Sequence, residues 1–450
     1  MFTLKELSRP DAMLMNILPR QKIDTEAVYT QSQFVFSHRV DGKLILFNTL
    51  TRGVFEIDGE YHGQTTGREI ADDKDLKTLL EGYFLVPESK DECAFYKGLF
   101  RIMHSFASVK GIQGYTVLPT FACNARYVYC YEEGMKPKAM TRETALQTVD
   151  YILRTRNCDN VTMNWFGGEP ILGEDIIDLI LGKLREAGIN YVSTMISNGS
   201  LITPEIVAKM RNDWNLKSIQ ISMDGARDDY YARKRYVSGD EHYEKVMRSV
   251  SDLSEAGIKV VIRCNVDGDN WQRIRLFIND AGDLIRHKDN VSLYFCPLFS
   301  VRSSDKDVEI WREIIAAGPM IEEAGFHRCG YMGFLKGFRR NYCIADGNSV
   351  VIAPDGSLFA CEHCLPESRY GDVAEGPADE EALNAFSRSD HIRDKCKACV
   401  FLPECTGFAS CPVEDRHCIA VREMLAADML EKLSRKTDLV VENGIAAKVC

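Results

Sequence analysis

Cysteine thiols are the side chains whose number and spacing point most directly to chemistry in this chain. Sixteen cysteines occur in 450 residues, and only five precede residue 290 whereas seven lie within 361–418. Thiolates at such short spacings are ligands of zinc and of iron–sulfur clusters. The first residues lack the basic-then-apolar layout of a signal peptide, so we expect a cytoplasmic protein whose clustered thiols bind metal instead of forming disulfides.

The charge balance disfavours some classes of partner. The chain has 55 basic and 66 acidic residues, a net charge of −11, which argues against nucleic acid and anionic membranes as main partners. No apolar run approaches the length of a membrane span. We therefore expect a soluble protein that has neither nucleic acid nor membrane as its partner, with about three domains for its length.

An earlier pair of thiols, Cys123 and Cys130, lies in the segment 120–131, which reads T-F-A-C-N-A-R-Y-V-Y-C-Y. The spacing would be C-x3-C-x2-C if position 127 were cysteine, but it is Tyr127. Two thiolates leave such a site one ligand short. What this segment can bind therefore depends on what Tyr127 does there.

Alternating strands and helices must position these thiols. The expected strands are 113–119, 161–165, 191–197, 217–223, 258–266 and 291–296. Helical stretches with apolar stripes lie between them, one of them ended by Gly188 and another begun by Thr203 and Pro204. Six repeats of strand and helix predict parallel strands with covering helices, either as a barrel or as an open doubly wound sheet.

Polar residues follow the expected strands, where the loops of a parallel barrel carry its reactive groups. The cysteine segment follows the first strand. Paired glycines after the second strand would let a ligand approach the backbone, and the next carboxylate can accept hydrogen bonds from an ammonium group. An ordinary glycine turn and helix caps are the plain alternatives. The candidates at the later strand ends are Gly167, Gly168, Glu169, Ser197, Asn198, Ser222, Asp224 and Arg263.

These motifs resemble those of radical S-adenosyl-L-methionine (SAM, AdoMet) enzymes. The resemblance implies a partial (β/α)6 barrel and a [4Fe–4S] cluster held by Cys123 and Cys130. It also implies that the backbone at Tyr129 contacts adenine, and that the Gly167–Glu169 motif binds the AdoMet amino group. The ribose and methionine moieties are expected near Ser197, Asn198, Ser222 and Asp224, with Arg263 similar in type. Arg235, in the cluster 233–235, is a candidate cation for the AdoMet carboxylate, or else part of a solvated charge run.

The C-terminal thiols form an independent pattern, C-x2-C-x5-C-x5-C-x6-C from Cys396 to Cys418. It resembles the SPASM domain, which binds two auxiliary [4Fe–4S] clusters, although structural zinc suits sets of four cysteines equally well. The resemblance implies one cluster at Cys396, Cys399, Cys405 and Cys418, and another at Cys343, Cys361 and Cys411 with Cys329, Cys364 or substrate as fourth ligand. Glu362 matches an acidic general base of sulfatase-maturing relatives, or it is a surface residue.

The N-terminal part reads as a small α+β unit with strands at 33–37, 43–48 and 54–57 and a helix containing Leu76, Leu79 and Leu80. This layout is similar to winged-helix leader-peptide recognition domains, whose hairpin edge can accept an extended peptide as an extra strand. It could instead only cover the edge of the barrel. The expected domains are 1–105 for leader recognition, 106–325 for the barrel, 326–436 for SPASM and 437–450 as a tail.

Together the resemblances imply a radical SAM/SPASM maturase that installs a thioether or carbon–carbon crosslink in a ribosomally made precursor peptide. Its partners would be a precursor peptide with a leader segment and an electron donor such as flavodoxin or ferredoxin. Tyr127 leaves three accounts open: a substituted copy of an active enzyme, a degenerate peptide-binding member, or a phenolate that ligates iron. An anaerobic sulfatase-maturing enzyme and a non-catalytic scaffold are the alternatives. We expect Tyr127 to impair this chain.

Overall fold

The computed structural model describes most of the chain up to residue 379 and small parts of the remainder. The described residues are 2–40, 42–106, 111–130, 136–239, 242–298, 305–329, 349–364, 366–379, 381–382, 392, 394–403, 418, 422–424 and 426–427. Three predicted metal ligands, Cys343, Cys405 and Cys411, lie outside them, as does the tail 437–450.

All six expected strands of the barrel are present. Each pairs in parallel with the next, so that alternate side chains of one strand share a face with those of its neighbours. The strands are β8 (Gly114–Val117), β9 (Asn160–Trp165), β10 (Asn190–Ser197), β11 (Leu216–Met223), β12 (Lys259–Val266) and β13 (Val291–Pro297). The parallel topology predicted from the alternation of strands and helices is confirmed.

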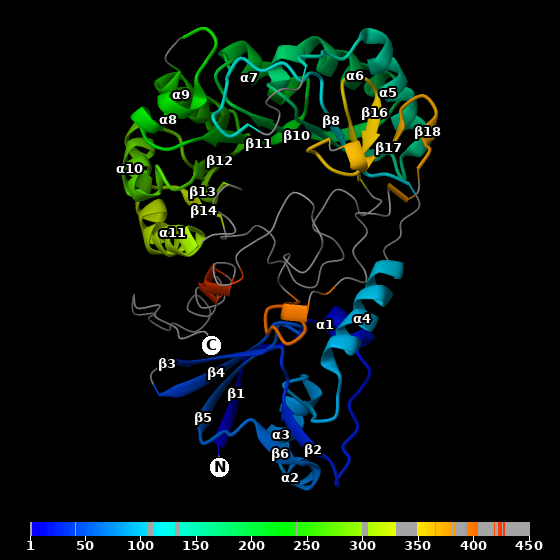
Figure 1. The fold of residues 1–450 in the computed structure, drawn as a ribbon, viewed down its shortest axis with the longest axis vertical. Coiled ribbons are helices and arrows are strands. Elements are labelled where there is room, and N and C mark those ends of the chain that lie inside the picture. The colour runs from blue at the N-terminus through cyan, green and yellow to red at the C-terminus, as the bar shows by residue number, and fades with distance from the viewer. Residues whose placement is uncertain are drawn as a thin grey trace.

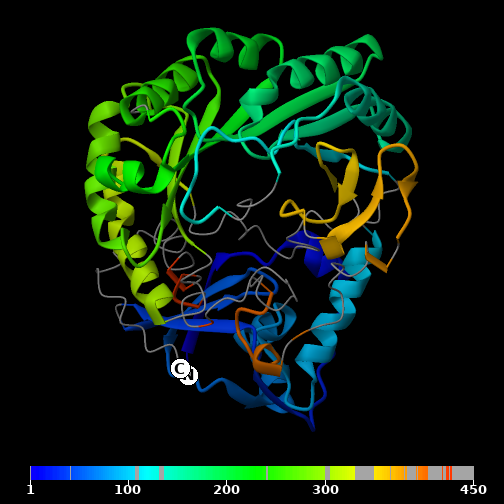
Figure 2. The ribbon, with the colours of Figure 1, turned by 45° about the horizontal axis from the view of Figure 1, so that its top comes forward.

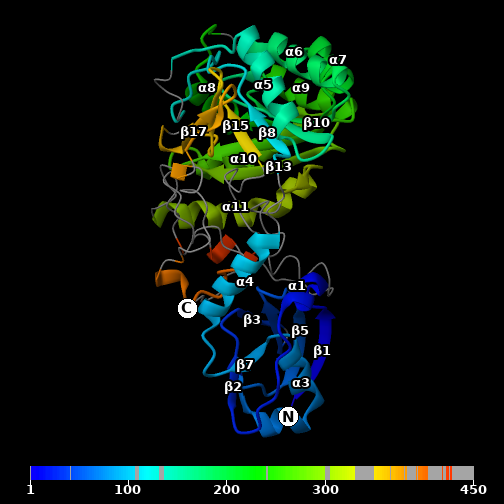
Figure 3. The same cartoon turned by 90° about the vertical axis from the view of Figure 1, so that its right-hand side faces the viewer.

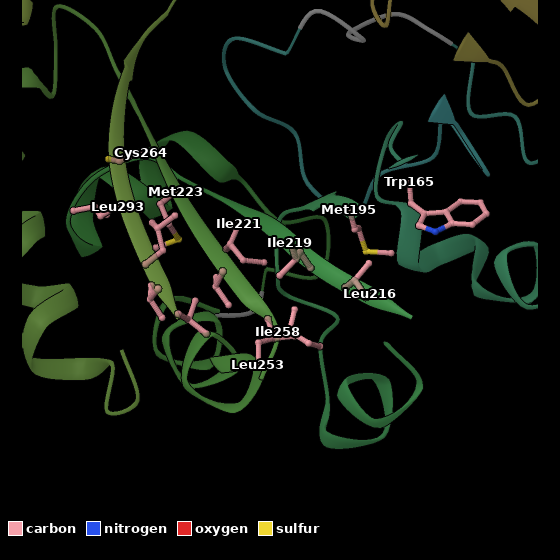
Figure 4. Packing of buried hydrophobic residues seen from close by; sticks show 14 of the residues in the cluster. Trp165, Met195, Leu216, Ile219, Ile221, Met223, Leu253, Ile258, Cys264 and Leu293 are labelled. Atoms are coloured by element: carbon pink, nitrogen blue, oxygen red, sulfur yellow. The ribbon is translucent and has the colours of Figure 1, made fainter. Parts of the chain in front are cut away.

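Helices cover the outer face of this sheet in an open arc (Figures 1 and 2). They are α5 (Arg142–Thr155), α6 (Glu174–Glu186), α7 (Pro204–Asn212), α8 (Arg227–Lys234), α9 (Tyr243–Glu255), α10 (Ile274–Leu284) and α11 (Asp305–Glu323). Buried side chains such as Ile219, Ile221 and Met223 of β11 fill the layer between sheet and helices (Figure 4). Thr203 caps α7 and Pro204 is its first residue, as the sequence predicted.

The parallel sheet extends further than the sequence indicated. Its strand order is β14-β13-β12-β11-β10-β9-β8-β15-β16-β17-β18, and β15 (Ser349–Ile352) lies parallel to β8. The other added strands are β14 (His327–Arg328), β16 (Ser357–Phe359), β17 (Arg369–Asp372) and β18 (Gly376–Pro377). Since β15 borders the strand that leads into the cysteine segment, the chain after residue 349 returns directly beside the candidate site.

The N-terminal body contains two antiparallel sheets of orders β1-β5-β4-β3 and β6-β2-β7. The predicted hairpin and its third strand are present as β3 (Val35–Val40), β4 (Lys43–Asn48) and β5 (Val54–Gly59), whereas β1 (Phe2–Ser8) was not predicted. The shorter strands are β2 (Val28–Gln31), β6 (Gln64–Thr66) and β7 (Leu85–Pro87). The helices are α1 (Ala12–Ile17), α2 (Gly67–Asp72), α3 (Lys74–Glu81) and α4 (Glu92–Phe106), and α4 leads toward the barrel (Figure 3).

A cysteine-bearing turn from the C-terminal region, residues 394–403, packs on this N-terminal body. Leu402 is 1% exposed within an apolar cluster of N-terminal residues that includes Phe34. The Thr49 hydroxyl donates to the Val400 carbonyl at 2.6 Å, and the Phe401 ring lies 5.5 Å from that of Phe36. Residues 1–105 therefore share their core with a segment three hundred residues away.

We expect Leu402→Ala to lower the free energy of unfolding by about 2–5 kcal/mol, because it leaves a cavity in this shared cluster. Urea denaturation followed by tryptophan fluorescence and circular dichroism measures the change. Leu172→Ala is the matched control, since Leu172 is 47% exposed and should change little. Equal effects of the two substitutions would show that the 394–403 turn is not packed as described.

No helix in the described part of the chain combines the length and the apolar character needed to cross a bilayer.

Candidate functional site

The cysteine loop, residues 120–130, lies at the carboxyl ends of the parallel strands. Backbone hydrogen bonds tie it to the end of α8 and the residues that follow: Arg126 N donates to Lys234 O at 3.0 Å, and Val128 N to Arg233 O at 3.2 Å. Val237 N donates back to Asn124 O at 2.9 Å. The loop is therefore fixed against this segment at the strand ends, where parallel barrels carry their reactive loops.

Gly167 and Gly168 bring the end of β9 against this loop. Gly168 N donates to Thr120 O at 3.0 Å, and Glu169 N to Ala122 O at 2.9 Å. A Cβ at Gly168 would lie 2.2 Å from Ala122 O, and Gly167 has a φ of +114°. The close approach that these glycines permit is thus made by the chain's own cysteine loop, which revises our interpretation of the pair as a place of ligand approach.

We expect Gly168→Ala to destabilise the protein by at least about 1–3 kcal/mol, since the added methyl group meets backbone atoms that cannot rotate away. Thermal unfolding measures the loss. Gly182→Ala in α6 is the matched control: its Cβ would meet nothing within 4 Å, so the substitution should be neutral or mildly stabilising. A Gly168→Ala protein as stable as the control would contradict the described packing.

Glu169 is fully buried and already partnered. Its carboxylate accepts hydrogen bonds from the Ser197 hydroxyl at 2.8 Å, Asn198 N at 2.8 Å and Ile171 N at 3.3 Å. Burial raises the pKa of Glu169 above its ordinary value, and these hydrogen bonds partly oppose the shift. A carboxylate has about four acceptor positions, so these three hydrogen bonds leave about one of them unfilled.

Two residues that the sequence analysis did not single out complete this side of the site. Asn198 Nδ2 donates to Asn124 Oδ1 at 2.8 Å, and Asn124 Nδ2 donates to the Ser200 hydroxyl at 2.9 Å. The Ser200 hydroxyl in turn donates to Asn198 Oδ1 at 2.6 Å. Only the position of Asn124 directly after Cys123 could have suggested its role.

On the other side of the site, the surrounding polar side chains contact Asp224. Its carboxylate accepts a hydrogen bond from the Tyr129 hydroxyl and lies 3.3 Å from Lys234 Nζ, and Asp224 and Lys234 are both 0% exposed. Asn265 Nδ2 donates to the Tyr129 hydroxyl oxygen at 2.8 Å. Burial, followed by the charge of Asp224, raises the pKa of Tyr129 well above 10, which keeps this phenol protonated.

Arg235, the predicted cation, is not part of this cluster. Arg235 is the C-cap residue that directly follows α8, and it has a left-handed φ of +47°. Its side chain is exposed and donates from Nε to Ala232 O at 3.2 Å. The buried cations of the site are instead Lys234, which lies beside Asp224, and Arg233, which pairs with Asp267 at 2.7 Å.

Tyr127 fills the position where a third thiolate would be required. Its ring stacks on that of Tyr129 with centroids 5.8 Å apart, and Lys234 Nζ lies 4.4 Å from the Tyr127 centroid. Burial, followed by the charge of Cys123, raises the pKa of Tyr127 well above 10, and burial raises that of Cys123 to about 11. Two thiols and a neutral, stacked phenol do not match the three thiolates that a [4Fe–4S] cluster needs here.

Arg263 and Ser222 lie on the inner face of the sheet. Arg263 pairs in register with Ser222, and its Nε donates to Asn265 Oδ1 at 3.0 Å. Arg263 thus joins the hydrogen-bonded chain that includes Tyr129. The charge of Cys296 raises the pKa of Arg263, and the exposed Glu362 contributes less to the same shift.

The predicted auxiliary ligands are only partly described. Cys361 is buried after β16, Cys329 is half-buried beside β14, and Cys418 is exposed. Cys396 and Cys399 share the turn 394–403, in which Cys399 N donates to Cys396 O at 3.1 Å. Within the described residues no three histidine, cysteine or acidic side chains come together as a metal site. Each predicted set includes cysteines outside those residues, so both sets stay predictions.

The barrel is similar to known proteins in both sequence and fold. Residues 117–281 match the family model of the Radical SAM superfamily. GTP 3',8-cyclase of Clostridium perfringens (strain SM101 / Type A) is 25% identical over 294 residues, which cover 60% of this chain and 87% of the relative. The structure of native anSMEcpe with bound AdoMet superposes with a TM-score of 0.56 at 15% identity, covering 72% of this chain and 98% of that one. Streptococcus suis SuiB bound to precursor peptide SuiA gives 0.50 at 14% identity, covering 87% and 99%.

Proposed function

Starting from the radical SAM domain that residues 117–281 form, we propose that the chain binds AdoMet and a precursor peptide, as a peptide-modifying enzyme whose radical chemistry is impaired by Tyr127. The observation that carries this proposal is that Glu169 and Lys234 both adjoin the cysteine loop, through the backbone hydrogen bonds from Glu169 N to Ala122 O and from Arg126 N to Lys234 O. The carboxylate of Glu169 and the ammonium group of Lys234, which is paired with Asp224 in the structure, have the charges opposite to those of the amino and carboxylate groups of an amino acid such as AdoMet.

The reaction proposed for the lineage is hydrogen abstraction from the peptide, followed by a thioether or carbon–carbon crosslink. Auxiliary [4Fe–4S] clusters at the C-terminal cysteines and an electron donor such as flavodoxin or ferredoxin belong to the same proposal. For this chain no step through the cluster at Cys123 and Cys130 follows, because its donor set is incomplete.

The peptide is proposed to bind along the N-terminal body. Of the strands described there, β3 pairs with β4 alone and so forms one edge of its sheet, which can accept an extended segment as a further strand. The outer face of the sheet is partly covered by the 394–403 turn through Phe36 and Phe401. A leader bound at β3 would therefore lie next to the predicted ligands Cys396 and Cys399.

Binding to the full chain tests this proposal. Fluorescence anisotropy is measured with a labelled peptide encoded next to the gene, with the same peptide lacking its leader as control, and AdoMet binding is measured by equilibrium dialysis. Saturable binding of AdoMet and of the leader-containing peptide is expected. Absence of peptide binding would leave the N-terminal body with a packing role only. The fragment 1–105 is unsuitable because Leu402 belongs to its core.

An anaerobic sulfatase-maturing activity is the second candidate, and the match of Glu362, directly after Cys361, to the acidic general base of such enzymes favours it. A carboxylate at this position could accept a substrate proton. A cysteine- or serine-containing sulfatase peptide that binds while the leader peptide does not would favour this candidate over the first.

A further inference from the structure

The inner face of the second half of the sheet carries polar residues that the proposed AdoMet site leaves unused. They alternate with the buried apolar residues that face the helices, so that Gln220, Arg263, Tyr294 and Cys296 line the interior. The Tyr294 hydroxyl donates to Gln220 Oε1 at 2.9 Å across the intervening strand. Arg263 supplies the positive charge among these four.

The guanidinium group of Arg263 is held in a fixed orientation by two neighbours. Its Nε donates to Asn265 Oδ1 at 3.0 Å, and one terminal nitrogen, Nη2, donates to Cys296 Sγ at 3.3 Å. The other terminal nitrogen, Nη1, makes no hydrogen bond to any residue that the structure describes. Arg263 is partly exposed. The Nη1 edge of the fork is therefore the one that a ligand in the barrel would bind.

Two features suit this open edge to a carboxylate. A planar guanidinium group binds carboxylates through parallel N–H donors. The charge of Cys296, with a smaller contribution from Glu362, raises the pKa of Arg263, so the guanidinium group stays positively charged and attracts a carboxylate.

The carboxylate that binds Arg263 need not be that of AdoMet. The amino acid part of AdoMet carries its amino and carboxylate groups on one carbon, and the cation whose charge acts on Glu169 is Lys234. Arg263 lies instead with Cys296 on β12 and β13, farther along the sheet from β9. Arg263 is therefore a second cation of the site, separate from Lys234, whose partner in the structure is the Asp224 carboxylate.

We infer that Arg263, with Cys296 beside it, forms a subsite for a carboxylate of the peptide substrate, either an acidic side chain or the C-terminal carboxylate. The inference rests on the proposed function and assigns part of its substrate specificity. Gln220 and Tyr294 form the neutral polar wall of the same subsite.

Alkylation of Cys296 in the full chain tests it, because a carboxylate bound at Arg263 would shield a thiol 3.3 Å from the guanidinium group. The probe is N-acetyl-aspartate amide, and N-acetyl-asparagine amide is its neutral control. The rate of reaction with iodoacetamide is followed by mass spectrometry of the Cys296 peptide. We expect about tenfold slowing at a probe concentration about ten times its Kd, no slowing by the neutral control, and no change at the exposed thiol of Cys158.

Two variants of Arg263, and AdoMet as a third ligand, identify the cause of any protection of Cys296. Arg263→Gln should abolish the protection and Arg263→Lys should retain part of it. The inference is overturned if the two amides protect equally, if protection persists in Arg263→Gln, or if AdoMet protects Cys296 while the aspartate amide does not. The AdoMet and leader-peptide binding assays do not use Cys296, so the proposed function can fail or stand separately from this result.

Discussion

Tyr127→Cys should convert a protein that forms no detectable 5′-deoxyadenosine from AdoMet into one that forms it readily. The substitution supplies the missing thiolate in the C-x3-C-x2-C spacing. It also removes the Tyr127 ring, which stacks on the Tyr129 ring and contacts the Lys234 ammonium group. After anaerobic reconstitution and reduction, 5′-deoxyadenosine is measured by liquid chromatography. Iron per chain should rise by about four, the content of one [4Fe–4S] cluster.

Tyr127→Ser is the control for this experiment, because it removes the ring without supplying a thiolate. It should hold no additional cluster and form no 5′-deoxyadenosine. If the unaltered chain already forms 5′-deoxyadenosine at the rate of Tyr127→Cys, then two thiolates and a phenol suffice, and the argument from the donor set is wrong.

The parallel sheet could be predicted because its signal is local. Each strand is a short apolar run, and each helix repeats its apolar residues along one face, so the type of every element is contained in its own ten or so residues. The polar ends of those strands then had to meet at one edge of the sheet. Glu169, Ser197 and Asn198 were brought together for this reason.

Features that depend on distant partners could not be predicted. Nothing within 349–352 distinguishes a strand beside β8 from a strand elsewhere, and the pairing joins residues more than two hundred positions apart. The same holds for Leu402, whose apolar side chain is buried by N-terminal residues. Among the three consecutive cations, the sequence does not indicate which side chains are buried; the structure buries Arg233 and Lys234 and leaves Arg235 exposed.

The buried pair of Lys234 and Asp224 should dominate the stability of the site. We expect Lys234→Met to lower the free energy of unfolding by about 3–5 kcal/mol, because it leaves the fully buried Asp224 carboxylate without its cation. Denaturation in urea, with the slope checked for two-state behaviour, measures the change. Lys209→Met is the matched control: its ion pair with Asp178 has the shorter distance of 2.7 Å but lies at the surface, so the loss should be below about 1 kcal/mol.

A second substitution identifies the cause of that loss. Asp224→Asn removes the charge that Lys234 neutralises, while its amide oxygen can still accept a hydrogen bond from the Tyr129 hydroxyl. The double variant Lys234→Met/Asp224→Asn should therefore be more stable than Lys234→Met alone, although it carries one more substitution. If the second change instead adds a further loss of its own, Lys234 stabilises the fold mainly through its packing against Tyr127 and Tyr230, and the ion pair contributes little.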